Sequence, residues 1–147
     1  MKKIYLLPVL ILCLIYGCSD LDENYSTNPN HTLAFSTDTL AFDTVFTTIS
    51  STTKKFMVYN RNKEALNIES ILLAGKGNTG FRMNVDGRKG TEFNNITILS
   101  KDSMYVFVEL TVDPKDENNP FELKDSVEFI FNGVKQFVLL QGYGQDA

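Results

Sequence analysis

The strongest constraint on the fold is residues 103–112, where apolar side chains occupy every second position. One face of this segment would carry Met104, Val106, Val108, Leu110 and Val112, and the other Tyr105, Phe107, Glu109 and Thr111. Because side chains alternate between the two faces of a strand, this pattern predicts a half-buried β-strand. Asp113-Pro114 is expected to end it, since proline has no amide hydrogen to donate to a sheet.

Similar short runs, separated by turn-forming residues, fill the chain from residue 32 onward, and no window predicts a helix. The predicted strands cover residues 33–35, 40–46, 54–59, 66–73, 81–85, 96–99, 103–112, 126–131 and 135–143. Many short strands without helices are typical of an all-β fold, here an antiparallel two-sheet sandwich of immunoglobulin-like type. The chain has no tryptophan, so only the architecture of antibody domains is predicted.

The last two predicted strands are joined at Asn132-Gly133, a strong hairpin signal. A two-residue loop would place Glu128 opposite Phe137 and mix a charge into an apolar face. A three-residue loop would instead place Phe129 opposite Phe137 and keep that face apolar. The longer loop is therefore expected.

The N-terminus resembles a bacterial lipoprotein signal peptide. Two lysines precede an apolar run over residues 4–15, and Gly17 comes directly before Cys18. The run contains Pro8 and is shorter than the roughly 20 apolar residues that a spanning helix needs. Residues 1–17 are therefore expected to be removed, and Cys18 is the predicted site of lipidation, with palmitate as one of the acyl chains. An ordinary secretory signal is the alternative.

Cysteine content and charge restrict the mature chain further. Cys13 would leave with the signal peptide and Cys18 would carry lipid, so neither a disulfide nor a cysteine-based metal site is expected. The chain has 14 basic and 18 acidic residues, and removing Lys2 and Lys3 leaves 12 against 18, a net charge of −6. A partner role for nucleic acid is not expected, because phosphates attract basic surfaces.

Residues 18–31 are polar, contain Pro29 and lack an apolar period, which predicts a flexible tether between the lipid and a domain at residues 32–147. Ser19 followed by Asp20, Asp22 and Glu23 resembles the export signal of surface lipoproteins in Bacteroidetes. That resemblance implies an outer-membrane protein, held by its lipid anchor at the cell surface.

Several motifs have a structural interpretation that is stronger than a functional one. Residues 75–80 match G-x-G-x-x-G, but a strand pattern follows where a dinucleotide site needs a helix, so a loop and no cofactor are expected. Residues 87–90 are predicted to form a turn. The acidic residues of segment 113–119 fit no calcium-loop spacing and predict a solvated loop.

No catalytic group is predicted either. The only histidine, His31, lies in the expected tether, away from any scaffold that could complete a Ser-His-Asp triad. Tyr59, Tyr105 and Tyr143 could stack on sugars, but each is expected to be a core or half-buried strand residue. Four Asp-Ser/Thr-aliphatic triplets resemble O-glycosylation acceptors of exported Bacteroidetes proteins, at Thr39, Thr44, Ser103 and Ser126.

Five segments, residues 42–48, 58–62, 81–87, 108–114 and 143–147, resemble the N-terminal immunoglobulin-like domain of Bacteroidetes surface lipoproteins. In such proteins a right-handed parallel β-helix often follows, and this chain ends where it would begin. The resemblance implies a non-catalytic envelope module, a spacer or interaction domain for a glycan or protein partner. The alternative is a truncated accessory domain of a β-helix lipoprotein that binds or degrades polysaccharide. Oligomeric state is left open.

Overall fold

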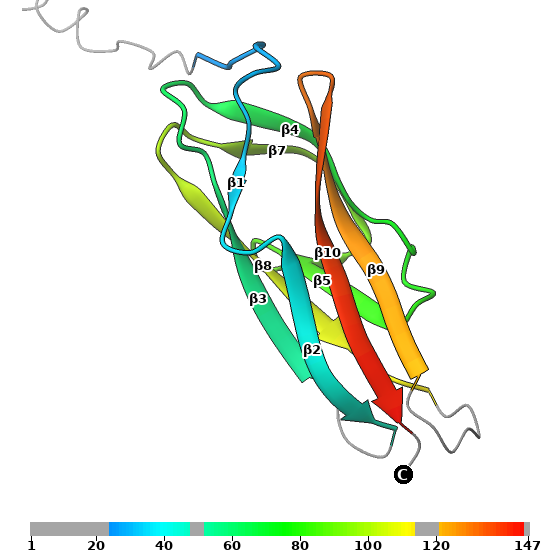
Figure 1. Cartoon of the computed structure of the whole chain (residues 1–147). Helices are drawn as coiled ribbons and strands as arrows, with labels where there is room; N and C mark the ends of the chain where they lie inside the picture. Colours follow the sequence, from blue (N-terminus) through cyan, green and yellow to red (C-terminus); the bar gives the residue numbers. More distant parts are fainter. Residues whose placement is uncertain (1–23, 48–51, 114–120, 146–147) are drawn as a thin grey trace, which may run out of the picture.

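The computed structural model describes residues 24–47, 52–113 and 121–145, which form two packed five-stranded sheets (Figure 1). Sheet I has the order β1 (Ala34–Phe35), β3 (Thr52–Tyr59), β8 (Ser103–Leu110), β5 (Phe81–Val85) and β6 (Arg88–Gly90). Sheet II has the order β2 (Thr39–Phe46), β10 (Val134–Gln145), β9 (Phe121–Phe131), β4 (Leu66–Leu73) and β7 (Glu92–Ile98). The predicted all-β, two-sheet sandwich is confirmed.

One strand pair differs from the expected antiparallel arrangement. β2 runs parallel to β10, with Leu40 opposite Leu140 and a register shift between Gln141 and Tyr143. Every other strand pair in the described residues is antiparallel. The chain crosses from sheet I to sheet II between β1 and β2, so its N-terminal part contributes a strand to each layer.

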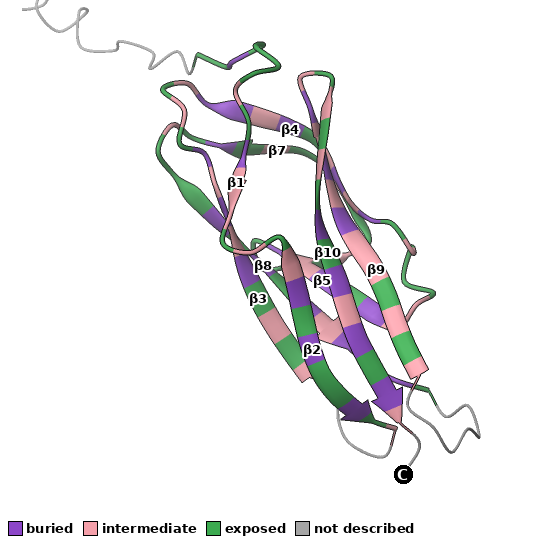
Figure 2. Ribbon diagram, viewed as in Figure 1, coloured by how far each residue is buried: buried purple, intermediate pink, exposed green. Residues whose placement is uncertain are grey.

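The core lies between the sheets and contains the inward face of every long strand, as the alternating buried and exposed bands in Figure 2 show. Aromatic contacts join the layers: the Phe129 ring of sheet II lies 5.0 Å from that of Phe35 and 6.3 Å from that of Phe56, both in sheet I. The predicted faces of β8 are confirmed, because its inward residues are buried while Tyr105 and Phe107 are exposed.

The prediction of a three-residue loop between β9 and β10 is wrong. Phe137 pairs with Glu128, and the loop is the two residues Asn132 and Gly133, with φ of 49° and 72°. Two consecutive positive φ angles define a type I′ turn, whose twist matches that of the flanking strands. Phe137 therefore points to solvent and is 54% exposed.

The shorter loop places polar Gln136 opposite buried Phe129. Its side-chain oxygen accepts a hydrogen bond from the Leu33 amide at 2.9 Å, and its nitrogen donates to the Leu33 carbonyl at 3.1 Å. This pairing removes the cost of placing an amide at the edge of the core.

Residues 87–90, predicted to form a turn, contain a strand instead. Asp86 and Gly87 have φ of 50° and 83° and form the turn, and β6 begins at Arg88 and pairs with β5. The turn signal was therefore placed one residue too late, and a three-residue edge strand was missed.

Residues 24–31, expected to belong to the flexible tether, are attached to the sandwich. The Ser26 amide donates to the Ala65 carbonyl at 2.9 Å, and the Ala65 amide donates to Asn24 at 3.1 Å. The Asn132 side chain also donates to the Ser26 carbonyl at 2.9 Å. Residues 24–31 are therefore held against the sandwich rather than forming part of a flexible tether, while Cys18 and the rest of the expected signal and tether lie outside the described residues.

Candidate functional site

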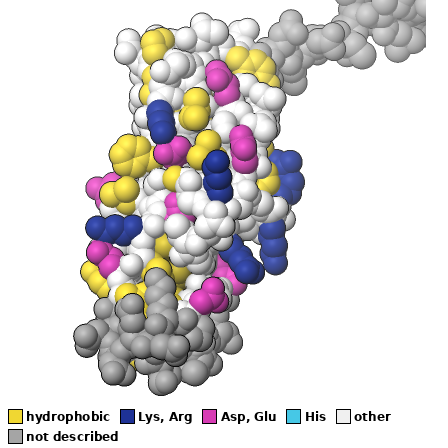
Figure 3. All heavy atoms as spheres, turned by 90° about the vertical axis from the view of Figure 1, so that its right-hand side faces the viewer, with side chains coloured by type: hydrophobic (Ala, Val, Ile, Leu, Met, Phe, Trp, Pro, Cys, Tyr) yellow, Lys and Arg dark blue, Asp and Glu magenta, His cyan; other side chains and the backbone are white. Residues whose placement is uncertain are grey.

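Charge divides between the two sheets. The strands of sheet I contain five basic residues and one acidic residue: Lys54, Lys55, Arg82, Arg88, Lys89 and Glu109. Those of sheet II contain two basic and six acidic residues: Lys124, Lys135, Asp43, Glu69, Glu92, Glu122, Asp125 and Glu128. In Figure 3, several Lys and Arg side chains lie along the right-hand edge of the molecule, and others lie at the left and centre of the view. The acidic net charge of the chain therefore conceals a basic sheet.

Strand register builds a continuous row on the outer face of sheet I. Lys55 of β3 lies opposite Phe107 of β8, Phe107 opposite Asn84 of β5, and Asn84 opposite Lys89 of β6. Directly opposed residues project from the same face with neighbouring Cβ atoms. Four strands thus bring two cations, an aromatic ring and an amide into one line.

A pair of exposed aromatic rings lies at this row. Tyr105 and Phe107 are 45% and 39% exposed, their ring centroids are 6.2 Å apart, and their planes are tilted by 31°. The Lys55 ammonium lies 5.0 Å from the Tyr105 centroid, within the range of a cation–π contact. The two rings form a broad apolar platform beside positive charge.

The three tyrosines named above have different environments. Tyr59 is half-buried, as expected, and lies beneath the Arg61 guanidinium at 5.0 Å. Tyr105 and Tyr143 are 45% and 42% exposed, so the expectation that they are core or half-buried is wrong. Tyr105 belongs to the outer face of sheet I, whereas Tyr143 lies on sheet II.

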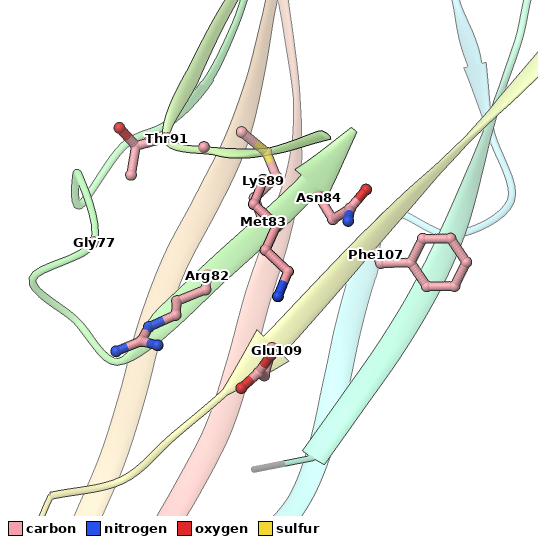
Figure 4. A pocket seen from close by; sticks show the side chains of 9 residues that line it. Gly77, Arg82, Met83, Asn84, Lys89, Thr91, Phe107 and Glu109 are labelled. Atoms are coloured by element: carbon pink, nitrogen blue, oxygen red, sulfur yellow. The ribbon is translucent and has the colours of Figure 1, made fainter. Parts of the chain in front are cut away.

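A concavity of about 410 Å³ lies against the same row, and its lining includes Arg82, Asn84, Lys89, Phe107 and Glu109 (Figure 4). In Figure 4, the Lys89 side chain extends between Arg82 and Glu109 on one side and Asn84 on the other. In the described part of the chain, no ion pair involves Arg82, Lys89 or Glu109. The charged groups here are therefore available to a ligand.

Asn84 adds an unusual polar atom to this concavity. Its side-chain oxygen is enclosed and accepts no hydrogen bond from the described residues. An enclosed acceptor without a donor is costly, so such atoms are uncommon in folded proteins. The atom is also closed to solvent, so a ligand does not reach it in this conformation.

The single histidine is part of a turn. The Ser26 hydroxyl lies 2.5 Å from His31 Nδ1 and accepts a hydrogen bond from the Asn28 amide at 3.2 Å. Ser26 is 4% exposed, so a substrate could not reach this hydroxyl. The Ser26–His31 contact fixes the N-terminal segment, which sequence reasoning had assigned to a tether.

The glycine-rich loop at residues 75–80 is held by Asp125 of β9. One carboxylate oxygen accepts from the Gly75 amide at 2.8 Å, and the other accepts from the Thr79 hydroxyl at 2.5 Å. A Cβ on Gly75 would lie 2.5 Å from this carboxylate, so the close approach requires glycine. The loop leads directly into β5, which confirms the prediction of a strand after it.

Some of the remaining predicted sites lie outside the described residues, and the others can be placed by their exposure. Cys18 and residues 114–120 of the acidic stretch lie outside them. Within the described ranges, no three His, Cys, Asp or Glu side chains are close enough to hold a metal ion, and no helix is long and apolar enough to cross a membrane. Of the four predicted acceptor residues, Thr44 and Ser103 are exposed, and Thr39 and Ser126 are half-buried.

Comparison with known proteins supports the fold. No family model matches the sequence, and no curated protein sequence matches it. A protein of unknown function from Porphyromonas gingivalis W83 is similar in structure, with 13% identity, a TM-score of 0.53, and coverage of 75% of this chain and 45% of that one. A family 123 glycoside hydrolase from Clostridium perfringens is also similar, with 7% identity, a TM-score of 0.54, and coverage of 79% and 27%.

The chain spans less than half the length of either of these solved structures. At such low identities the likeness shows a shared all-β fold and nothing of activity. One of the two neighbours comes from Porphyromonas, a member of the Bacteroidetes.

Proposed function

We propose that this chain is a lipid-anchored interaction domain of the bacterial outer membrane, without catalytic activity, that binds a glycan or protein partner through the outer face of sheet I. The observation that carries this proposal is the row formed by Lys55, Phe107, Asn84 and Lys89. It combines exposed aromatic surface with cations that form no ion pair among the described residues. These are features of binding surfaces, whose centres contain aromatic anchors and a few placed polar groups.

The position of the N-terminal segment suits an anchored module. The first described segment, drawn in blue, lies at one end of an elongated body, and β10 ends at the opposite end (Figure 1). At about 3.3 Å per residue, the twelve residues of β10 span about 40 Å. A lipid on Cys18, six residues before Asn24, would hold the body by one end and leave both sheet faces open to solvent.

We further propose that the chain belongs with the immunoglobulin-like domains of Bacteroidetes surface lipoproteins. Three sequence features support this assignment: the N-terminus that resembles a lipoprotein signal peptide, the acidic residues after Cys18, and the five segments that resemble such domains. The likeness to the Porphyromonas gingivalis protein agrees with it at the level of fold.

The second candidate function is an accessory domain of a longer lipoprotein that binds or degrades polysaccharide. It is favoured by the occurrence of the fold within longer chains, one of them a glycoside hydrolase that acts on glycolipid glycans. The end of β10 lies opposite the N-terminal segment, so a following region would be carried away from the membrane. A β-helix reading frame directly downstream of the gene would favour this candidate.

Metabolic labelling tests the anchor. Native cells are fed labelled palmitate, and the full chain is compared with Cys18→Ser by recovery of label, by envelope fractionation and by protease treatment of intact cells. We expect label and envelope association in the unmodified protein only, together with cleavage by external protease. A Cys18→Ser protein that stays with the envelope would contradict the proposal.

A further inference from the structure

We propose that the concavity on sheet I binds an acidic glycan, one that carries carboxylate or sulfate groups on several sugar units. This inference rests on the proposed function and names the class of partner. Its structural basis is the arrangement of the Tyr105–Phe107 platform, the three cations Lys55, Arg82 and Lys89, and the acceptor Glu109 on one outer face.

The aromatic platform supplies the surface for a sugar ring. Tyr105 and Phe107 present two neighbouring ring systems to solvent. The electron-rich face of an aromatic ring attracts weakly positive C–H groups, and one face of a pyranose ring presents several of them. Burying that face also removes apolar surface from water. A sugar would therefore lie flat beside Lys55.

The positions of the cations indicate a ligand longer than one sugar. Lys55 and Lys89 lie on β3 and β6, which are separated by β8 and β5. With neighbouring strands about 4.8 Å apart, their backbones are separated by about 14 Å. A single small anion cannot contact both positions, whereas an oligosaccharide with repeated acidic groups can.

Arg82 and Glu109 form the adjacent row. They are cross-strand neighbours, yet no ion pair within 4.0 Å joins them. Arg82 can present a planar pair of donors to a carboxylate or sulfate. Glu109 can accept hydrogen bonds from sugar hydroxyls, and the surrounding cations keep the whole face positive.

The aromatic platform favours a glycan over a simple inorganic anion. A sugar ring can stack on Tyr105 and Phe107 while its acidic groups meet the neighbouring cations, whereas inorganic sulfate has no apolar face to stack. The acidic strands of sheet II would repel the same ligand, so binding is directed to one face.

The test measures binding of the full-length lipidated protein in detergent by calorimetry. The probes are oligogalacturonate and its methyl ester, dextran sulfate and dextran, and glycerol phosphate as a small soluble anion. We expect at least one acidic polymer to bind about tenfold more tightly than its uncharged counterpart, with affinity falling as salt rises. Binding of oligogalacturonate alone would indicate a carboxylate ligand, and binding of dextran sulfate alone would indicate a sulfate ligand. Either result supports the proposal.

Matched variants locate the site. Lys55→Gln with Lys89→Gln should weaken binding of the acidic polymer about tenfold, because both ends of the row lose their charge. Lys124→Gln with Lys135→Gln removes the same charge from sheet II and should change affinity less than about twofold. Phe107→Ala should weaken binding with the cations intact, and circular dichroism should confirm the fold of every variant.

The proposal is overturned if the acidic polymers bind no better than their neutral partners, if only glycerol phosphate binds, or if both charge variants lose affinity equally. If the neutral polymers bind as well as the acidic ones, and Phe107→Ala abolishes that binding, then the proposal of an acidic ligand is wrong. The proposal of an interaction domain on sheet I would still hold. If no palmitate label is recovered, the proposed lipid anchor is contradicted, and the result of the binding measurement is unaffected. The two proposals therefore fail separately.

Discussion

The basic residues of the two sheets differ in whether they form ion pairs. On sheet II both lysines form ion pairs: Lys124 with Glu122 at 3.3 Å and Lys135 with Glu128 at 2.9 Å. On sheet I, within the described residues, no basic strand residue is ion-paired. Neutralised charges cannot attract a ligand from a distance, whereas unpaired ones can. One fold thus provides an acidic sheet whose two lysines are ion-paired and a basic sheet whose charge is open to a partner.

The sheets also expose different apolar residues. Sheet I presents Tyr105 and Phe107 among cations, and sheet II presents Phe137, Leu139 and Tyr143 on β10. The sheet II residues follow from the two-residue hairpin, because this register turns every second residue of β10 outward. Exposed apolar groups alone do not identify a ligand site, so charge and the concavity distinguish sheet I.

The largest expected effect tests that register. Phe129→Ala should lower the free energy of unfolding by about 4 kcal/mol, because its ring is fully buried against Phe35 and Phe56 of the other sheet. Phe137→Ala is the matched change on β10 and should cost less than about 0.5 kcal/mol. Urea denaturation of both variants measures the difference. Equal losses would mean that the three-residue loop is correct after all.

Next in size is the loss of a buried amide that ties the two sheets together. Asn60 follows β3 of sheet I, and its side-chain nitrogen donates to the carbonyls of Glu64, Ile98 and Leu99 at 2.9, 2.9 and 3.2 Å. Asn60→Ala leaves these carbonyls without that donor and should cost about 3 kcal/mol. Exposed Asn78→Ala should be nearly neutral in the same denaturation experiment. A loss below about 1 kcal/mol for Asn60→Ala would show that water replaces the amide.

Sequence reasoning located most strands because alternation and turn residues are local signals. It found both faces of β8 and the strand after the glycine-rich loop. The predicted β9–β10 register was wrong because the inward side chain of Gln136 forms hydrogen bonds with the backbone of Leu33. Leu33 is 103 positions away along the chain, so no local pattern indicates this contact. Sequence reasoning also gave no signal for the parallel pairing of β2 with β10.

The candidate site was harder to predict than the fold. Lys55, Asn84, Lys89 and Phe107 come from four strands and meet only through register. The net charge of the whole chain sums the acidic residues of sheet II and the basic residues of sheet I, so it gives no sign that sheet I is basic. Tyr105 was named from the sequence as a candidate for stacking on sugars, which stays a prediction, and its exposure was not expected.

A smaller effect compares the hairpins of the two sheets. Gly87 of the β5–β6 turn and Gly133 of the β9–β10 turn both have positive φ, and a Cβ at either would meet nothing within 4 Å. Alanine should therefore cost about 1 kcal/mol through backbone strain alone. Gly133→Ala should lower global stability, because β9 and β10 pair over most of their length.

Gly87→Ala should instead loosen the short β6 locally, because this edge strand has three residues. Hydrogen exchange should detect faster exchange at Arg88–Gly90 with little change in the unfolding midpoint. A matching drop in the midpoint for both variants would show that the two turns are equally coupled to the core.

The smallest effect concerns the ion pairs of sheet II. Glu122→Gln removes the partner of Lys124, and both side chains are largely exposed, at 42% and 68%. Such surface pairs contribute little, so the change in unfolding free energy should stay below about 0.5 kcal/mol. Thermal melting at low and high salt measures it. A loss above about 1 kcal/mol would show that sheet II depends on these pairs for stability.

Hydrogen exchange of the full-length protein with and without oligogalacturonate tests the central claim, that sheet I is the binding face, most directly. We predict protection in β3, β8, β5 and β6, with β2, β9 and β10 unchanged. Protection confined to sheet II, or none at saturating ligand, would contradict the assignment of the binding face.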